Sequence, residues 1–262
     1  VPFEAVHEIL FAEGEVLART PYALFSVDTA TFEVTRFTKQ GGLTDVDPTA
    51  LGFDPIRQRW IVGYANGSID LRDTFGTANI PDLRIAQIQG DKAINDIYVE
   101  GNFAYLATNF GVVVLDLQKD EIADTWKLTA DSSPINAEFV VSHNNQWLVG
   151  TQLGIFTAPQ QEAFLSNPER WQTWSNVPDL GPALDLMRYA DLWWLATGTK
   201  NSSDIVVWRG DDNGFWEVAP GWNENGSKYG GMATGSWILN DDGTRSDGML
   251  VASCCQVLGW DA

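Results

Sequence analysis

The chain has 262 residues, 44% of them apolar and 12 of them tryptophan, so it is long enough to bury a large hydrophobic core. Its 16 Lys and Arg residues stand against 35 Asp and Glu residues, and the net charge of −19 repels nucleic-acid phosphates and anionic lipid surfaces. No apolar run approaches the roughly 18 residues that a membrane-spanning helix needs. The charge therefore argues against a nucleic-acid partner, and the short apolar runs argue against a membrane span.

A pattern of three short apolar runs, separated by Gly, Asn and Asp residues, recurs along the chain. It is clearest at residues 93–99, 105–107 and 111–116, and the first 28 residues repeat it. The residue just before the third run serves as a marker, and the markers are 44, 44, 43, 50 and 52 residues apart: Ala23, Gly67, Gly111, Gly154, Asp204 and Gln256. Four β-rich runs in every 40 to 50 residues are typical of the blades of a β-propeller.

The sequence therefore predicts an all-β fold, a single β-propeller domain over residues 1–262 with six visible blades of four antiparallel strands. The repeats lie near residues 5–48, 49–92, 93–133, 134–182, 183–234 and 235–262. Fourth strands are expected at 34–37, 84–88, 125–128, 171–174 and 216–218, and a helix is expected only at 160–166. The near absence of helices disfavours a parallel α/β fold. A β-sandwich is the alternative, although it does not require a 44-residue register.

The amino-acid sequence of two repeats resembles known propeller families. Gly42-Leu43-Thr44-Asp45, followed by "ALGFD" at 50–54 and "VGYANG" at 62–67, resembles the repeat of two-component-regulator propellers. Residues 62–71 and 90–128 are similar to the N-terminal β-propeller of PorZ-like proteins of the type IX secretion system, and this likeness is strongest over about residues 1–130.

The resemblance implies a protein without catalytic activity that is secreted to the cell surface or periplasm of a Gram-negative bacterium. It implies membership in the attachment complex that handles cargo proteins and anchors them to lipopolysaccharide. It also implies seven blades in the intact propeller, one more than the repeats visible here.

Polar residues at the start of the first strand of each repeat are expected to gather around one mouth of the central channel. They are His7, Thr49, Asn95, Asn136, Asp185 and Ser236. Hydrogen bonds from these short side chains to neighbouring backbone explain them without a ligand. The alternative is a metal site at Asn95, Asn136 and Asp185, as in lactonase-like hydrolases. Calcium would suit those oxygen ligands, whereas no cofactor is the primary expectation.

Other catalytic arrangements have little support in this sequence. With only two histidines, His7 and His143, a Ser-His-Asp triad has few candidate bases, and no G-x-S-x-G elbow, P-loop or dinucleotide fingerprint is present. The acidic stretches 211–214 and 240–243 resemble the start of calcium loops but lack the distal Glu, so hairpin turns are the favoured interpretation.

Aromatic residues outside the expected strands are candidates for a binding surface. Tyr22, Tyr64 and Phe110 precede the third strand of successive repeats, where they are expected to project from one face beside Asn66. Trp222 and Tyr229 belong to a long expected loop at 220–235. Exposed aromatic rings suit sugar stacking and protein contact.

These observations predict a non-enzymatic binding propeller of a PorZ-like component, whose partner is a secretion-complex protein or a surface glycan such as lipopolysaccharide. Two alternatives stay open. One is an extracytoplasmic ligand-sensing propeller of a two-component regulator, and the other is a metal-dependent lactonase-like hydrolase.

Overall fold

The structure is a computed structural model that describes residues 6–12, 14–88, 90–131, 133–175, 177, 181–199, 204–219, 229–239, 245–253 and 257–261, the last three ranges by their backbone only. Contacts divide the chain into two compact units, Val1–Val149 with Phe156–Gln172 and Gly150–Ile155 with Thr173–Ala262. The single domain therefore stays a prediction. Within the described ranges, no helix has the length and apolar character needed to cross a membrane.

Five sheets of four antiparallel strands follow one another along the chain, and we call them blades 1 to 5. Blade 1 comprises β1 (Glu8–Ala12), β2 (Glu15–Arg19), β3 (Leu24–Asp28) and β4 (Val34–Phe37). Blade 2 comprises β5 (Pro48–Asp54), β6 (Arg59–Tyr64), β7 (Ile69–Arg72) and β8 (Thr77–Ile80). Blade 3 comprises β9 (Ile94–Glu100), β10 (Phe103–Thr108), β11 (Gly111–Asp116) and β12 (Glu121–Trp126).

The remaining two blades have the same order. Blade 4 comprises β13 (Ala137–His143), β14 (Gln146–Thr151), β15 (Gly154–Pro159) and the two-residue β16 (Gln172–Thr173). Blade 5 comprises β17 (Ala183–Tyr189), β18 (Leu192–Thr197), β19 (Val206–Gly210) and β20 (Trp216–Val218). The C-terminal sheet has three strands, β21 (Tyr229–Leu239), β22 (Arg245–Ser253) and β23 (Val257–Asp261).

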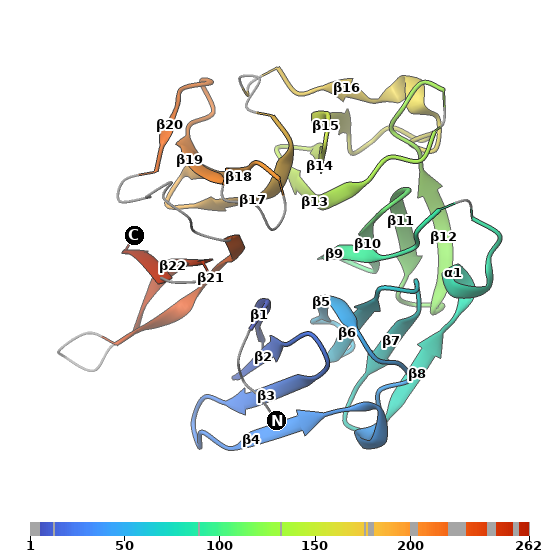
Figure 1. Cartoon of the computed structure of the whole chain (residues 1–262), viewed down its shortest axis with the longest axis vertical. Coiled ribbons are helices and arrows are strands. Elements are labelled where there is room, and N and C mark those ends of the chain that lie inside the picture. Colours follow the sequence, from blue (N-terminus) through green and yellow to red (C-terminus); the bar gives the residue numbers. More distant parts are fainter. Residues whose placement is uncertain are drawn as a thin grey trace. The chain divides into compact units, whose positions relative to one another are not determined.

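The first strands of blades 1 to 4 are neighbours in sequence order, as a propeller requires. In the first unit β1 contacts β5, β5 contacts β9 and β9 contacts β13 (Figure 1). The predicted all-β propeller with four-stranded antiparallel blades is therefore confirmed, but the prediction of six such blades is wrong. Only five of the described sheets have four strands. The described residues after blade 5 form a sheet of two long strands and one short strand, without a fourth.

Two expected elements differ from the structure. The fourth strand of blade 2 lies at β8, ahead of the expected 84–88, because Pro81 ends it and Asp82–Ile85 forms the short helix α1. The expected helix at 160–166 is a series of turns that leads to the 3₁₀ helix η2 at Pro168–Arg170, which the Asn167 side chain caps by accepting from the Glu169 N–H.

Apolar side chains fill the spaces between neighbouring blades. Ile61 and Ile69 of blade 2 lie in one buried cluster with Ile94 and Leu106 of blade 3. The blades approach so closely there that a Cβ placed on Gly63 would lie 2.7 Å from Ile94 Cγ2. A glycine at this position is what permits the observed inter-blade distance.

Aspartates close the hairpins that follow several third strands. Asp28 Oδ1 accepts from the Ala30 and Thr31 N–H groups at 2.9 and 2.7 Å, and Asp211 Oδ1 accepts from Asn213 and Phe215 at 2.9 and 3.0 Å. These backbone donors lower the pKa of both carboxyls. The predicted hairpin at 211–214 is thus confirmed, whereas 240–243 lies outside the described residues.

Candidate binding surface

The structure brings together two of the residues expected at the channel mouth. Asn95 Nδ2 lies 2.8 Å from Asn136 Oδ1 and 2.8 Å from the Ala137 carbonyl oxygen, which ties blade 3 to the start of blade 4. It also lies 2.8 Å from Asn109 Oδ1, and Asn136 Nδ2 in turn donates to Glu138 Oε1. The Asn95 and Asn136 amides therefore hydrogen-bond to each other, to Asn109 and Glu138 and to the backbone. These bonds give both side chains a structural role.

Three other expected members of that ring lie in or just before the first strand of their own sheets. His7 is an exposed residue just before β1, and its backbone N–H donates to the Arg19 carbonyl. Asp185 is half-buried in β17 of the second unit, and Ser236 lies in β21. Among the described residues, no group of three or more His, Cys, Asp or Glu side chains could hold a metal ion.

Carboxylates of first strands reach the next blade at regular intervals. Glu8 Oε1 accepts the backbone N–H of Leu51, 43 residues later, and Asp96 Oδ2 accepts that of Val140, 44 residues later. These intervals equal the repeat length, so Glu8 and Asp96, at the same position of their repeats, make the same hydrogen bond to the next blade. Blade 2 has Gly52 at this position, because Ile97 of blade 3 would lie 2.5 Å from an added Cβ. The acidic first strands therefore contribute to blade joining.

The Gly42-Leu43-Thr44-Asp45 motif fastens the loop after blade 1 to blade 2. The fully buried Asp70 of β7 accepts the Thr44 N–H at 2.8 Å and the Thr44 hydroxyl, and Asn79 Nδ2 donates to it at 2.9 Å. Leu43 is 4% exposed and belongs to the core between the two blades. The Gly-Leu-Thr-Asp motif therefore has a structural role in joining blade 1 to blade 2.

Tyr64 completes this network, and the expectation that it is exposed is wrong. Its hydroxyl donates to Asp70 Oδ2 at 2.7 Å, and the side chain is 0% exposed. Burial, together with the neighbouring Asp70 carboxylate, raises the pKa of the Tyr64 phenol above its ordinary value. The ring is directed inward because a buried carboxylate offers its hydroxyl a charge-assisted partner.

Phe110 is also buried, which contradicts its expected place at an exposed loop tip. It is 7% exposed and packs in the core between blades 2 and 3. Thr108 Oγ1 accepts the Phe110 N–H at 3.3 Å and donates to the Gly111 carbonyl at 2.8 Å, while Gly111 adopts φ +128°. This tight turn points the ring at the core.

The remaining expected binding residues have different settings. Tyr22 is 77% exposed, as expected. Asn66 is exposed, donates to Asp45 Oδ2 at 2.6 Å and accepts the Ser68 N–H at 2.9 Å, so it stabilises its own turn. Trp222 lies outside the described residues, and Tyr229 begins β21 rather than lying in a loop.

A set of exposed phenylalanines was not predicted, and they share one place in the repeat. Each lies between the third and fourth strands of its blade, in blades 1, 2, 4 and 5: Phe32, Phe75, Phe164 and Phe215, with exposures of 75%, 97%, 65% and 62%. In a propeller blade this connection lies at the opposite end from the one that carries Tyr22. The recurring sequence signal is an Asp at the end of the third strand, or directly after it, followed within four residues by Phe, at Asp28, Asp73 and Asp211.

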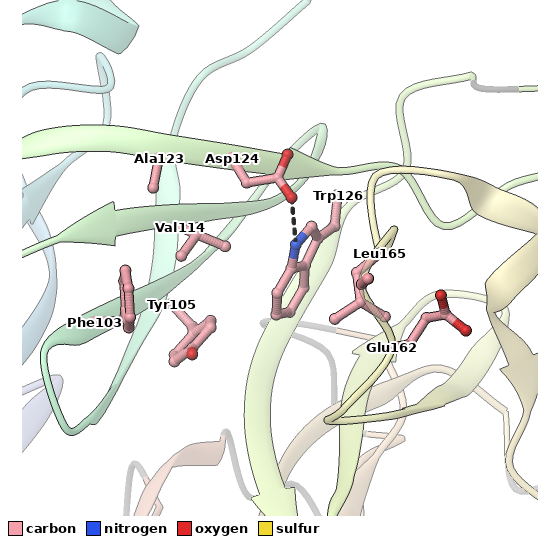
Figure 2. A pocket seen from close by; sticks show the side chains of 9 residues that line it. Phe103, Tyr105, Val114, Ala123, Asp124, Trp126, Glu162 and Leu165 are labelled. Carbon is pink, nitrogen blue, oxygen red and sulfur yellow. Dashed lines mark hydrogen bonds between the residues drawn. The ribbon is translucent and has the colours of Figure 1, made fainter.

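A pocket of about 240 Å³ opens in the first unit on the outer half of blade 3. Phe103 and Tyr105 of β10, Val114 of β11 and Ala123, Asp124 and Trp126 of β12 line it, and Glu162, Ala163 and Leu165 of the connection after β15 complete it. Figure 2 shows Asp124 at one end of the pocket, with its carboxylate over the indole N–H of Trp126, from which Oδ2 accepts at 3.2 Å.

An aromatic cluster supports the floor of this pocket. The Tyr105 ring lies 5.4 Å from the Trp126 ring and 4.1 Å from the Trp147 ring, centroid to centroid, and Trp171 lies 5.5 Å from Trp126. Burial and the nearby Glu100 carboxylate raise the pKa of Tyr105 to about 12. The floor therefore consists of closely packed aromatic rings, and the Glu100 carboxylate makes the local field negative.

Comparison with known proteins agrees with this architecture. The sequence matches the family described as TSS9, PorZ, N-terminal β-propeller domain over residues 16–172, more than half of the chain. The chain belongs to this PorZ N-terminal propeller family. The match begins within β2 of blade 1 and spans blades 2 and 3 and most of blade 4, including the Asp70 network, the Asn95–Asn136 contact and the aromatic pocket.

Solved structures that share the fold include the following two. The structure of PorZ of Porphyromonas gingivalis, described as an essential bacterial surface component of the type-IX secretion system, aligns with a TM-score of 0.71 at 18% identity and covers 97% of this chain. This chain spans only 36% of that PorZ chain. The computationally designed Ika8 protein aligns with a TM-score of 0.50 at 12% identity, over 99% of this chain and 96% of its own. None of the curated proteins compared with the sequence matches it.

Proposed function

We propose that this chain is a non-enzymatic binding propeller of a surface component of a type IX secretion system. Its membership in the PorZ N-terminal propeller family is the observation that carries the proposal. The cell surface is the proposed location, because the P. gingivalis protein with the same fold is a bacterial surface component.

A binding role fits the way the polar residues are used. Asn95, Asn136, Glu8 and Asp96, which a hydrolase could have used at the channel mouth, hold blades together. The proposed partner is a protein of the secretion complex or a surface glycan. The side chains offered to it are exposed aromatic rings, Tyr22 at one end of the blades and Phe32 and Phe75 at the other.

The net charge restricts the partner further. A chain with a charge of −19 attracts basic protein surfaces and repels phosphate-rich ones at long range. A protein partner with a basic, partly apolar surface therefore fits better than an anionic polymer, unless divalent cations bridge the two.

The experiment is an in-frame deletion of the propeller from the protein that contains it, in the bacterium of origin. We expect type IX cargo to disappear from the cell surface, measured by surface labelling and blotting, while the truncated protein is still produced. Complementation with the intact gene is the control. Normal surface cargo in the deletion strain would refute the proposal, and a kinase domain encoded in the same gene would point to a sensor instead.

A further inference from the structure

We propose that the blade 3 pocket binds the guanidinium group of an arginine side chain presented by another protein. The inference rests on the proposed function only in taking a protein as the carrier of that arginine. The recognition chemistry belongs to the pocket itself and is tested without the secretion complex.

The size of the pocket selects a single side chain. Sites for drug-sized ligands occupy about 300–1,000 Å³, and this pocket, with about 240 Å³, falls below that range. A run of several sugar residues therefore has no room within it. One long side chain entering from the surface does.

The lining selects a flat cation. Tyr105 and Phe103 present aromatic rings, Phe103 with 37% of its surface exposed, and the Trp126 edge closes the floor. Aromatic faces attract cations, and a planar guanidinium stacks on them better than an ammonium does. The cluster behind Tyr105 packs against the Tyr105 and Trp126 rings, so little rotamer freedom of these two side chains is lost when a ligand binds.

Asp124 supplies the matching charge. Its Oδ2 accepts from the Trp126 indole and its Oδ1 from the Thr125 N–H at 2.8 Å, so the carboxylate is fixed in position. Each carboxylate oxygen has a second lone pair with which to accept from a guanidinium. Glu162, at the other side of the pocket, already lies 3.8 Å from the Arg170 guanidinium within the chain, so Asp124 is the acceptor left for an incoming one.

The Trp126 indole provides a built-in reporter, because its N–H bonds to the carboxylate that would receive the ligand. The experiment records ¹H–¹⁵N spectra of the whole chain while Nα-acetyl-arginine amide is added, with the Trp126 signal identified by its loss in Trp126→Phe. Nα-acetyl-citrulline amide, which has the same shape without the charge, is the matched ligand. We expect saturable movement of the Trp126 signal with the arginine compound, with a dissociation constant on the order of 10 mM for so small a ligand.

Asp124→Asn removes the charge but keeps an oxygen that can accept from Trp126, and we expect it to weaken binding about tenfold. Glu121→Gln, at the exposed start of the same strand, removes one charge outside the pocket and should leave the affinity within about twofold. Equal movement with citrulline, or no saturable movement with arginine up to about 0.1 M, would overturn the proposal even if Asp124→Asn did not fold. Because only the chain and a small ligand are present, a negative result here is distinct from a failure of the secretion assay.

Discussion

Tyr64 donates a hydrogen bond to Asp70 at 2.7 Å, and both side chains are 0% exposed. The pair joins the end of β6 to β7 and lies under the loop that carries the Gly-Leu-Thr-Asp motif. A residue that reads in the sequence as a surface aromatic is therefore part of the polar interior of blade 2.

Tyr64→Phe should lower the free energy of unfolding by about 1–3 kcal/mol, because a buried carboxylate loses one of its donors. Folding raises the pKa of Tyr64 above 10.0, so its contribution is complete below about pH 10 and is lost as the pH rises further and the unfolded phenol ionises. Urea unfolding of wild type and variant at pH 8 and pH 11 checks this, and the difference between them should shrink at the higher pH. A constant difference would contradict the assigned protonation.

Gly63→Ala tests the close approach of blades 2 and 3. The added methyl group overlaps Ile94 Cγ2 and Cβ, so we expect a loss of about 1–3 kcal/mol in the free energy of unfolding. Ile94→Ala removes Cγ2, and the same glycine substitution should cost less in that background, a coupling that a double-mutant cycle measures. Additive costs would show that Gly63 matters for a reason other than this contact.

Asp116→Asn tests the aspartates that close third-strand hairpins. Burial raises the pKa of Asp116. The hydrogen bonds from the Gln118 and Lys119 N–H groups and the charge of the Lys119 ammonium lower this pKa by more, so that its net value lies below 3.8. The carboxylate therefore stabilises the fold above about pH 3.8, and this stabilisation is lost as the pH falls through its lower folded value. Denaturation at pH 6 and pH 3 should show a cost for the variant that is smaller at pH 3. Glu33→Gln, an exposed change of the same charge, is the control.

Phe75→Ser, at a side chain 97% exposed, should change the free energy of unfolding by no more than about 0.5 kcal/mol. The matched buried substitution, Phe110→Ser, should cost about 3 kcal/mol or more because it leaves a cavity in the core between blades 2 and 3. Thermal melts of the two variants separate the exposed ring from the structural one. A large loss of stability in Phe75→Ser would mean that the ring has a role in the fold.

The sequence was sufficient for the all-β propeller class and the four-stranded blade, but not for the number of such blades, because repeat spacing and alternating apolar residues are local signals. The 43- to 44-residue interval that predicted the blades reappears in the hydrogen bonds from Glu8 to Leu51 and from Asp96 to Val140. The meeting of Asn95 with Asn136 followed from the same register.

The surface was predicted less well, because the direction of a loop side chain depends on contacts from other blades. Tyr64 turns inward to a carboxylate six residues away, and Phe110 turns inward on a glycine with positive φ. The pocket joins β10 and β12 to a connection some 40 residues later, and no local pattern marks that meeting. Aspartate followed by Phe after a third strand is a signal that could have identified three of the exposed hairpin rings, Phe32, Phe75 and Phe215.

The most direct test of the binding role is the amount of type IX cargo on the surface of cells whose protein carries Phe32→Ser and Phe75→Ser together. Both rings are 75% or more exposed, so the variant should fold and reach wild-type levels. The account predicts reduced surface cargo with the double variant and normal cargo with Thr29→Ser and Thr74→Ser at neighbouring hairpin positions. Normal cargo in the Phe variant, at normal protein level, would contradict the proposal that these exposed rings bind the partner.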